Sequence, residues 1–328
     1  MKRNHLNGLM VGIWIMNALI VLLAAAGLAW YSVSVAAQAH DPAALALPGV
    51  PANTATPRPS ITPVPPPTQR PTITAWPTPS PAPSLTAPVA LPTNVMVIGY
   101  TRERRPLQVY FFGDGPIHKL IVAGIHGGYE WNTIALADQL IIYLNDHPER
   151  ITSDTTLYIL HDMNPDGLAH GKNPDGRANA NNVDLNHNWP YHWAPDWSRE
   201  GCFNERILSA GSGPGSELEV SALALFIKQI RPVALISYHS AAKVIFAGGV
   251  PDFQPSISLA RAVALASDYQ YPPTHTGCDY TGNLTDWAAN TQGVPAIDIE
   301  LTTHDSVDFD ENLKVLQAFL NWSNPVKK

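Results

Sequence analysis

The C-terminal part of the chain, about residues 94–328, alternates short apolar runs with longer stretches of helical periodicity. Continuous apolar runs are typical of strands buried on both faces of a sheet, and apolar residues recurring with helical spacing are typical of helices that cover it. The predicted strands are 108–112, 120–125, 156–160, 233–238 and 296–301. The predicted helices are 133–145, 217–230, 256–266 and 311–322. This alternation predicts an α/β domain with a mixed, mainly parallel central sheet and helices on both faces.

A long apolar run, residues 9–31, lies near the N-terminus behind Lys2 and Arg3. About 20 apolar residues are enough to cross a bilayer as a helix, and positive charge in front of the run keeps the N-terminus in the cytoplasm. We therefore expect a cytoplasmic stretch at 1–8 and a transmembrane signal-anchor at 9–31, with the rest of this single-pass protein outside the cytoplasm at the cell membrane. The alternative is a signal peptide cleaved near Ala39, in the stretch Ala37-Gln38-Ala39, which would give a secreted protein.

Proline marks the segment between this run and the predicted domain. The chain has 31 prolines, and residues 41–93 combine many of them with threonine and serine. A segment of this composition cannot bury enough apolar surface to fold, so we expect a disordered linker with much extended polyproline II structure. Such a linker is a semi-rigid spacer that would hold the domain at 94–328 away from the membrane.

Charge and cysteine content narrow the possible partners. The net charge is −7, which argues against a nucleic-acid partner. The two cysteines, Cys202 and Cys278, could form one disulfide outside the cytoplasm, or each could be a small buried residue. The sequence does not indicate an oligomeric state.

Three of the predicted strands lead into side chains that can bind a metal ion. His126 and Glu130 follow the second predicted strand, His239 follows the fourth, and Glu300 lies near the end of the last. Two imidazoles and one carboxylate that leave a fourth position open are typical of a catalytic zinc site, and a further carboxylate can act there as general base. Taken singly, each residue also has an ordinary explanation, such as a surface histidine, a carboxylate at a helix start or an ion-pair partner.

Short motifs in a fixed order connect these positions. They are N-P-D-G at 164–167, R-A-N-A-N-N-V-D-L-N-H-N-W-P at 177–190, G-S-G-P-G-S-E at 211–217, S-Y-H-S at 237–240 and I-E-L at 299–301. As an ordered set they resemble the carboxypeptidase A-like zinc metallopeptidase family, over nearly all of residues 100–325. The form of the V-D-L-N-x-N element and the short domain resemble a bacterial, murein peptide amidase-like variant.

The resemblance implies one Zn²⁺ per chain, bound by His126, Glu130 and His239. It implies that Glu300 is the general base and that Arg177 stabilises the oxyanion of the tetrahedral intermediate. It implies that Asp184 holds His126 in the correct tautomer. The remaining matched positions, which the resemblance assigns to substrate binding, are Asn186, His187 and Tyr280.

Three positions depart from the family pattern. The first two ligands lie in H-G-G-Y-E, one residue longer than the usual H-x-x-E, although Glu130 is still the best carboxylate ligand. The usual Asn-Arg pair that clamps a substrate carboxylate is Asn186-His187 here, and a histidine is shorter and only partly charged near neutral pH. The resemblance therefore does not imply strict recognition of a free C-terminus. Tyr280 matches the mobile substrate-side tyrosine only loosely.

The expected function is that of a zinc-dependent metallopeptidase outside the cytoplasm, of carboxypeptidase type, which hydrolyses peptide amide bonds with zinc-activated water. An alternative within the same family is an amidase that cuts γ-D-glutamyl–diamino acid bonds in murein peptides. Related deacylases of small acyl amino acids are a further alternative, and a non-catalytic cell-surface binding module is an alternative of another class. Retention of all three ligands, Glu300 and Arg177 argues against the binding module.

Overall fold

The computed structural model describes residues 94–198, 201–274, 278 and 280–325. The predicted cytoplasmic stretch at 1–8, the transmembrane segment at 9–31 and the linker at 41–93 lie outside the described residues. Among the residues that are described, no helix combines the length and the apolar character needed to cross a bilayer.

The described domain is built on a seven-stranded sheet with the order β1-β2-β4-β3-β5-β7-β6. The strands are β1 (Val95–Tyr100), β2 (Pro106–Phe112), β3 (Ile117–Val122), β4 (Thr155–Leu160), β5 (Ala234–Ser240), β6 (Ile245–Ala247) and β7 (Ala296–Leu301). The four central strands β4, β3, β5 and β7 are parallel. Strands β1 and β2 on one edge and β6 on the other run antiparallel to their neighbours. The prediction of a mixed α/β sheet is confirmed, and its parallel part is the centre.

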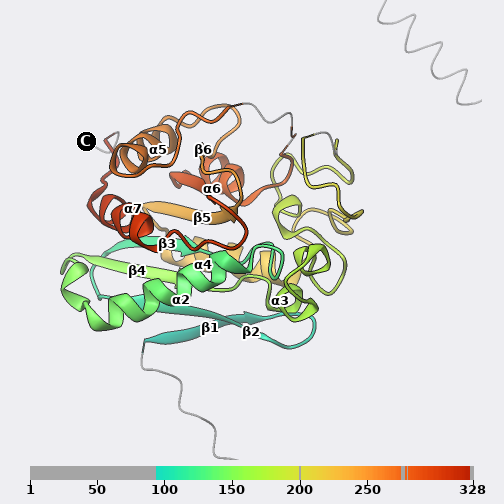
Figure 1. Ribbon diagram of the computed structural model, residues 1–328, viewed down its shortest axis with the longest axis horizontal. Coiled ribbons are helices and arrows are strands. Elements are labelled where there is room, and N and C mark those ends of the chain that lie inside the picture. The colour runs from blue at the N-terminus through green and yellow to red at the C-terminus, as the bar shows by residue number, and fades with distance from the viewer. Residues whose placement is uncertain (1–93, 199–200, 275–277, 279, 326–328) are drawn as a thin grey trace, which may run out of the picture. The chain divides into compact units, whose positions relative to one another are not determined.

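Helices cover both faces of this sheet (Figure 1). On one face α2 (Trp131–Asp146), α5 (Gln254–Ala266) and α7 (Phe309–Asn321) pack in one hydrophobic cluster with the sheet. On the other face α4 (Leu218–Ile230) and α6 (Leu284–Gln292) form a second cluster. Alternate residues of β3 join alternate clusters, Ile121 the first and Leu120 the second, because successive side chains of a strand point to opposite faces. The helices on both faces were predicted, and α6 was not.

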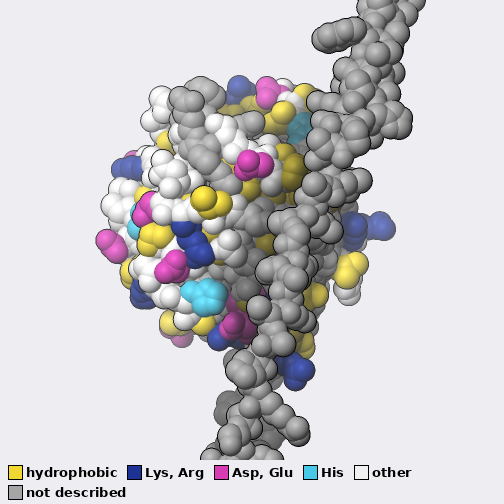
Figure 2. Space-filling model, turned by 90° about the vertical axis from the view of Figure 1, so that its right-hand side faces the viewer, with side chains coloured by type: hydrophobic (Ala, Val, Ile, Leu, Met, Phe, Trp, Pro, Cys, Tyr) yellow, Lys and Arg dark blue, Asp and Glu magenta, His cyan; other side chains and the backbone are white. Residues whose placement is uncertain are grey.

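The remaining elements are short and lie between β4 and α4, apart from one turn after α2. They are η2 (Pro148–Arg150), α3 (Pro165–His170), η3 (Pro174–Arg177) and η4 (Leu185–His187). The right-hand side of Figure 1, where α3 lies, faces the viewer in Figure 2. On the described surface in that view, Lys and Arg side chains are interspersed with Asp and Glu, without a large block of one sign (Figure 2).

Two predicted strand ends differ from the structure in a way that matters for the site. Strand β3 ends at Val122 instead of Ile125, because Gly124 takes the left-handed φ of 69° and turns the chain out of the sheet. Strand β5 continues to Ser240, so His239 lies within a strand and does not follow one. The edge strands β1 and β6 were not predicted: β1 lies at the rim and is only partly buried, and β6 has three residues.

Candidate metal centre

The turn after β3 brings His126 and Glu130 together. Gly127 has a φ of 47°, and a Cβ atom on Gly128 would lie 2.1 Å from the carbonyl oxygen of Gly171. Both positions therefore require glycine. The resulting turn places His126 Nδ1 2.7 Å from Glu130 Oε1, immediately before α2 begins. The longer H-G-G-Y-E spacing is thus accommodated by the turn, and Glu130 stays within reach of the same cation as His126.

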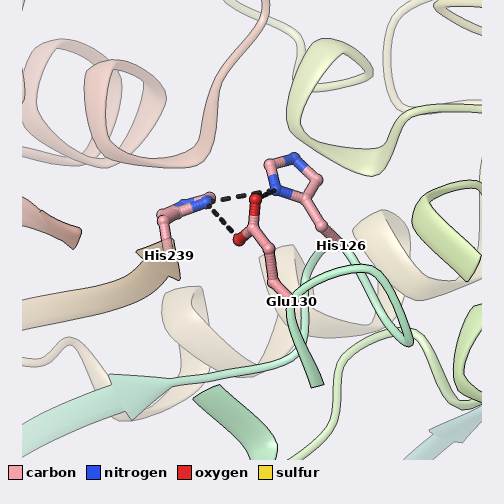
Figure 3. A group of neighbouring side chains, drawn as sticks. All are labelled: His126, Glu130 and His239. Carbon is pink, nitrogen blue, oxygen red and sulfur yellow. Dashed lines mark hydrogen bonds and ion pairs between the residues drawn. The ribbon is translucent and has the colours of Figure 1, made fainter. Parts of the chain in front are cut away.

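His239 reaches the same point from the neighbouring part of the sheet (Figure 3). Its Nδ1 lies 3.3 Å from His126 Nδ1 and 3.3 Å from Glu130 Oε2. One ligand atom from each of His126, Glu130 and His239 lies within 4.8 Å of the other two. All three residues are at most 4% exposed. The structure therefore brings together the three ligands that the sequence indicated.

The arrangement of these atoms fits a zinc ion. Two imidazoles turn the same nitrogen, Nδ1, towards each other and towards a carboxylate. Glu130 Oε2 is buried, and its contact with His239 Nδ1 at 3.3 Å is an ion pair without hydrogen-bond geometry; no hydrogen-bond partner is found for it among the described residues. A divalent cation would accept one lone pair from each group at once and leave a fourth position open, which is the donor set of catalytic zinc sites.

The outer nitrogen of each histidine faces a carboxylate. His126 Nε2 lies 3.2 Å from Asp184 Oδ1, as expected for the residue that orients this ligand. His239 Nε2 lies 3.4 Å from Asp298 Oδ1 and 3.0 Å from Ser237 Oγ. A carboxylate at Nε2 favours a proton there and leaves the Nδ1 lone pair for a metal.

Asp298 and Ser237 are site residues that sequence reasoning missed. A usable signal was present, because side chains two apart on a strand share a face. Ser237 lies two residues before His239, and Asp298 two residues before Glu300. In the parallel pairing of β5 with β7, Ser237 is opposite Asp298 and His239 is opposite Glu300. The four side chains therefore belong to one face of two neighbouring strands.

The N-P-D-G and V-D-L-N motifs position Arg177. Asn164 Nδ2 donates to the backbone carbonyl of Arg177 at 3.1 Å, and Asn164 Oδ1 caps α3 by accepting the N–H of Gly167 at 2.9 Å. The Arg177 side chain donates from Nε to Asp184 Oδ2 at 2.9 Å and from Nη1 to Glu130 Oε1 at 3.2 Å. The guanidinium is thus held beside the candidate metal ligands by two ion pairs.

The balance of burial and neighbouring charges lowers the pKa of two carboxyl groups at the site and raises the pKa of a third. Burial opposes ionisation of Glu130, but His126 and His239 outweigh it and hold the pKa of Glu130 below its ordinary range. Burial likewise opposes ionisation of Asp184, and Arg177 and His126 hold its pKa well below the usual value. Burial raises the pKa of Glu300 to about 7; the negative charge of Glu130 adds to this, and His239 opposes it. Glu300 is therefore the group of this set that can exchange a proton near neutral pH.

All the residues that the sequence singled out line one cavity of about 690 Å³. They are His126, Glu130, Arg177, Asp184, Asn186, His187, His239, Tyr280 and Glu300. Asn186 is fixed by its Oδ1, which accepts the N–H of Leu284 at the start of α6 at 3.0 Å. Tyr280 is 44% exposed and lines the cavity, and its ring lies 5.9 Å from that of Phe246.

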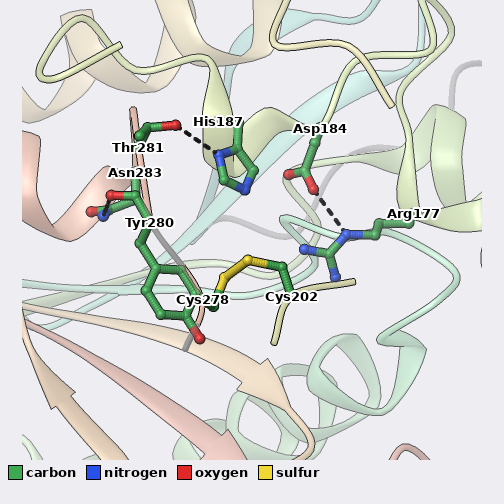
Figure 4. The surroundings of a disulfide bond; sticks show 8 residues. All are labelled: Arg177, Asp184, His187, Cys202, Cys278, Tyr280, Thr281 and Asn283. Atoms are coloured by element: carbon green, nitrogen blue, oxygen red, sulfur yellow. Dashed lines mark hydrogen bonds and ion pairs between the residues drawn. A yellow bond between two sulfur atoms is a disulfide. The ribbon is translucent and has the colours of Figure 1, made fainter. Parts of the chain in front are cut away.

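Cys202 and Cys278 form a disulfide, which settles the alternative left open by the sequence. The two residues are 76 positions apart, and both line the cavity. Figure 4 shows the disulfide beside Tyr280. The bond joins the irregular segment after η4 to the segment before α6, so the two walls of the cavity are covalently connected.

The α/β fold and the buried His-Glu-His group beside an arginine and a further glutamate define a metal-dependent hydrolase. The family model described as zinc carboxypeptidase matches residues 91–319, and the chain belongs to this family of zinc metallopeptidases. The metal of this family is zinc, which fits the ligand set found here. None of the curated proteins matches the chain by sequence.

Solved structures share the fold. Murein-tripeptide amidase MpaA from Escherichia coli O157 is 24% identical and has a TM-score of 0.54; the match covers 71% of this chain and 94% of that one. Bovine thrombin-activatable fibrinolysis inhibitor is 21% identical with a TM-score of 0.57, and the match covers 69% of this chain and 88% of that one. Carboxypeptidase A from Helicoverpa armigera is 18% identical with a TM-score of 0.53, and the match covers 71% of this chain and 69% of that one.

Proposed function

We propose that this metallopeptidase is of carboxypeptidase type and hydrolyses an amide bond near the C-terminal end of a peptide. The observation that carries the proposal is the convergence of His126, Glu130 and His239, with Glu300 opposite His239 on the next strand. Three ligands with an open fourth position suit a hydrolytic site better than a structural one.

The residues of the chain have separate roles in this proposal. Zinc, when bound, acts as a Lewis acid that acidifies a water molecule and polarises the scissile carbonyl. Glu300 accepts the proton of the attacking water and passes it to the leaving nitrogen, for which a pKa of about 7 is suitable. Arg177, fixed by Asp184, stabilises the negative charge that grows on the carbonyl oxygen. Asp184 and Asp298 orient the two histidines.

The proposal is tested with the full chain, purified in detergent and assayed on a panel of short peptides by mass spectrometry. We expect about one zinc per chain, as in other catalytic sites with this ligand set, and release of C-terminal fragments that stops with a chelator. Addition of zinc to the stripped protein is expected to restore cleavage. Protein that binds no metal and cleaves no peptide would instead support the binding-module alternative.

A murein peptide is the second candidate substrate. The described domain has the extent of the murein-tripeptide amidase from Escherichia coli, since the match covers 94% of that protein. A wall tripeptide with a γ-D-glutamyl–diamino acid bond therefore belongs in the same panel. Cleavage of this tripeptide with no release from ordinary peptides would replace the carboxypeptidase proposal by the amidase.

We also propose that the domain works outside the cytoplasm, tethered by the apolar run at 9–31 and spaced from the membrane by the linker at 41–93. The support is the length of the run, the basic residues before it and the proline-rich composition behind it. Fractionation of cells and the mass of the mature protein test this. An intact N-terminus in the membrane fraction supports the anchor, whereas a soluble exported form that begins near His40 supports the cleaved alternative.

A further inference from the structure

The extra residue of the H-G-G-Y-E turn is Tyr129, and its side chain lines the metal cavity. Gly127 and Gly128 have no side chains, so Tyr129 supplies the one side chain between the first two ligands. Its ring is partly buried and lies 5.0 Å from that of Phe203 and 4.7 Å from that of His304. Tyr129 therefore connects the turn after β3 to the irregular segment after η4 and to the loop after β7.

The hydroxyl of Tyr129 makes a second contact with the irregular segment. It donates to Glu205 Oε1 at 2.7 Å. Burial raises the pKa of Tyr129 to about 12, and the hydrogen bond to Glu205 adds to this, so the hydroxyl stays a donor at neutral pH. Phe203 is two residues before Glu205 and next to Cys202, which is bonded to Cys278. Phe203 is thus restrained by Tyr129 on one side and by the disulfide on the other.

Both rings lie against the guanidinium of Arg177. Arg177 Cζ is 4.8 Å from the centre of the Phe203 ring and 5.9 Å from the centre of the Tyr129 ring. A guanidinium within about 6 Å of an aromatic face is attracted to it by the charge distribution of the ring. The side chain of Arg177 is 11% exposed, so water screens this attraction only weakly. The two rings therefore contact the residue to which the oxyanion is assigned.

The ion pairs of Arg177 hold only one edge of its guanidinium. Nε donates to Asp184, and one N–H of Nη1 donates to Glu130. The other N–H groups are the donors for a substrate oxygen. A group held at one edge can swing about that edge, whereas a ring packed against the central carbon restricts this motion. The restriction matters for catalysis, because a misplacement of about 1 Å can cost on the order of 10²-fold in rate.

We propose that Phe203 and Tyr129 are positioning residues for Arg177, and that the extra residue of the H-G-G-Y-E turn holds Phe203 against the guanidinium. The rings act through Arg177, whose remaining N–H groups meet the oxyanion. The proposal rests on the peptidase function above and adds the residues that place its oxyanion donor. Because the oxyanion exists only on the way to the transition state, a displaced Arg177 lowers kcat and leaves KM unchanged.

The first test is Phe203→Leu in the full-length zinc-loaded protein. It uses a peptide that the wild type cleaves and a phosphinate analogue of that peptide, which mimics the tetrahedral intermediate. We expect kcat to fall about tenfold and the Ki of the phosphinate to rise by a similar factor, with KM and zinc content unchanged. Phe203→Tyr keeps the ring and is expected to recover most of the lost kcat. A loss through KM alone, or a lower kcat without weaker phosphinate binding, overturns the inference.

The second test separates the ring of Tyr129 from its hydroxyl. Tyr129→Leu is expected to lower kcat by about threefold, less than Phe203→Leu, because the Tyr129 ring lies farther from Arg177. Tyr129→Phe keeps the ring and loses the contact with Glu205, so its kcat should lie between that of the wild type and that of Tyr129→Leu. If Tyr129→Phe is as slow as Tyr129→Leu, the hydroxyl and not the ring is responsible, and the positioning role of the ring is refuted.

Tyr143→Leu is the matched control. Tyr143 is a partly buried tyrosine outside the cavity, and Arg150 Cζ lies 6.0 Å from the centre of its ring. This variant should keep the wild-type kcat, and an equal kcat in Tyr129→Leu would refute the role of Tyr129. Should Phe203→Leu fail to fold, the comparison of these two tyrosine variants decides the question. A wild-type protein that cleaves no peptide removes the peptidase function and this inference together, whereas an active wild type with unimpaired variants removes the inference alone.

Discussion

His126 and His239 are oriented in the same way, and the orientation depends on residues behind them. Each turns Nδ1 towards the metal site and Nε2 towards a carboxylate, Asp184 in one case and Asp298 in the other. Asp184 is also bound by Arg177, whereas Asp298 is held by the Thr285 hydroxyl. The two histidines therefore have separate supports, and each support can be tested on its own.

Removing the charge of Asp298 is expected to weaken zinc binding. In Asp298→Asn the carboxylate that favours the Nε2 proton of His239 is lost, and such supporting residues change metal affinity by roughly 10–100-fold. The measurement is zinc competition with a chromogenic chelator, which does not depend on activity. Asp305→Asn serves as control, because Asp305 is exposed. Equal zinc affinity in both variants would mean that Ser237 alone orients His239.

Removing the ionisable group of Glu300 is expected to abolish turnover and keep the metal. General acid–base catalysis contributes on the order of 10²–10⁴-fold, so Glu300→Gln should lose at least that much of kcat with normal zinc content. Zinc content measured by atomic absorption, alongside kcat, separates the two effects. Retention of more than a tenth of wild-type kcat would assign the proton transfer to another group.

The same residue sets the expected pH dependence. Burial raises the pKa of Glu300 to about 7, and a base must be unprotonated to act, so kcat/KM falls as pH drops through the pKa. A bound divalent cation favours the ionised form and moves this acid limb to lower pH. The residual kcat/KM of Glu300→Gln is expected not to fall at low pH in this way. A pH profile of the variant that keeps the same acid limb would contradict the assignment of that limb to Glu300.

At the scale of elements, the C-terminal helix α7 is attached to the sheet by a buried lysine. Lys119 lies in β3, is 1% exposed and donates from Nζ to the carbonyl oxygens of Phe319, Leu320 and Trp322 at 2.7, 2.7 and 2.8 Å. The last carbonyls of a helix have no partner within the helix and carry partial negative charge. One ammonium therefore caps α7 and fixes it beside the central strands.

Replacing this cap with an apolar side chain is expected to destabilise the domain. Lys119→Met removes the ammonium donor from three carbonyl oxygens near the end of α7, of which only Phe319 O keeps a backbone partner among the described residues, the Trp322 N–H, and we expect a loss of about 2–4 kcal/mol in unfolding free energy. Urea denaturation followed by circular dichroism gives the value. Lys314→Met, at a lysine on α7 with 56% of its side chain exposed, is the control and should change stability by less than about 0.5 kcal/mol. Equal midpoints for the two variants would refute the capping role.

At the scale of the whole molecule, the cavity is assembled from distant parts of the chain. The ligands come from the turn after β3 and from β5, Glu300 comes from β7, and Arg177 comes from the irregular region between β4 and α4. The disulfide between Cys202 and Cys278 connects that region to the segment before α6. The positions of Tyr280 and His187 relative to the ligands therefore depend on this bond.

Loss of the disulfide is expected to affect both stability and substrate binding. A bond that closes a loop of 76 residues stabilises by about 2–4 kcal/mol in typical proteins, so the double variant Cys202→Ser/Cys278→Ser should unfold at a lower temperature. His126 and Glu130 precede this loop, and His239 lies inside it but is held in the central strand β5, so zinc content should stay unchanged while KM rises. Calorimetry and steady-state kinetics measure these effects, and a drop in zinc content with unchanged KM would show that the bond supports the metal site instead.

Sequence pattern and ordered motifs by themselves indicated the strands at the centre, the long helices and the candidate ligand set. Buried parallel strands and amphipathic helices have strong local periodicity, and the zinc ligands lie in motifs whose order along the chain is itself informative. The strand at Ala296–Leu301 was predicted to the residue. Edge strands and the polar helix α6 were not, because partly buried or short elements carry little periodic signal.

Tertiary structure alone decided the rest. Which carboxylate supports His239, whether Cys202 meets Cys278, and whether Phe203 lies against Arg177 all depend on packing between segments far apart in sequence. Local sequence sets the chemistry that each side chain can perform, because that follows from its functional groups. Burial and through-space distance set the charge and the partner of each group, and they exist only once the sheet has placed those segments side by side.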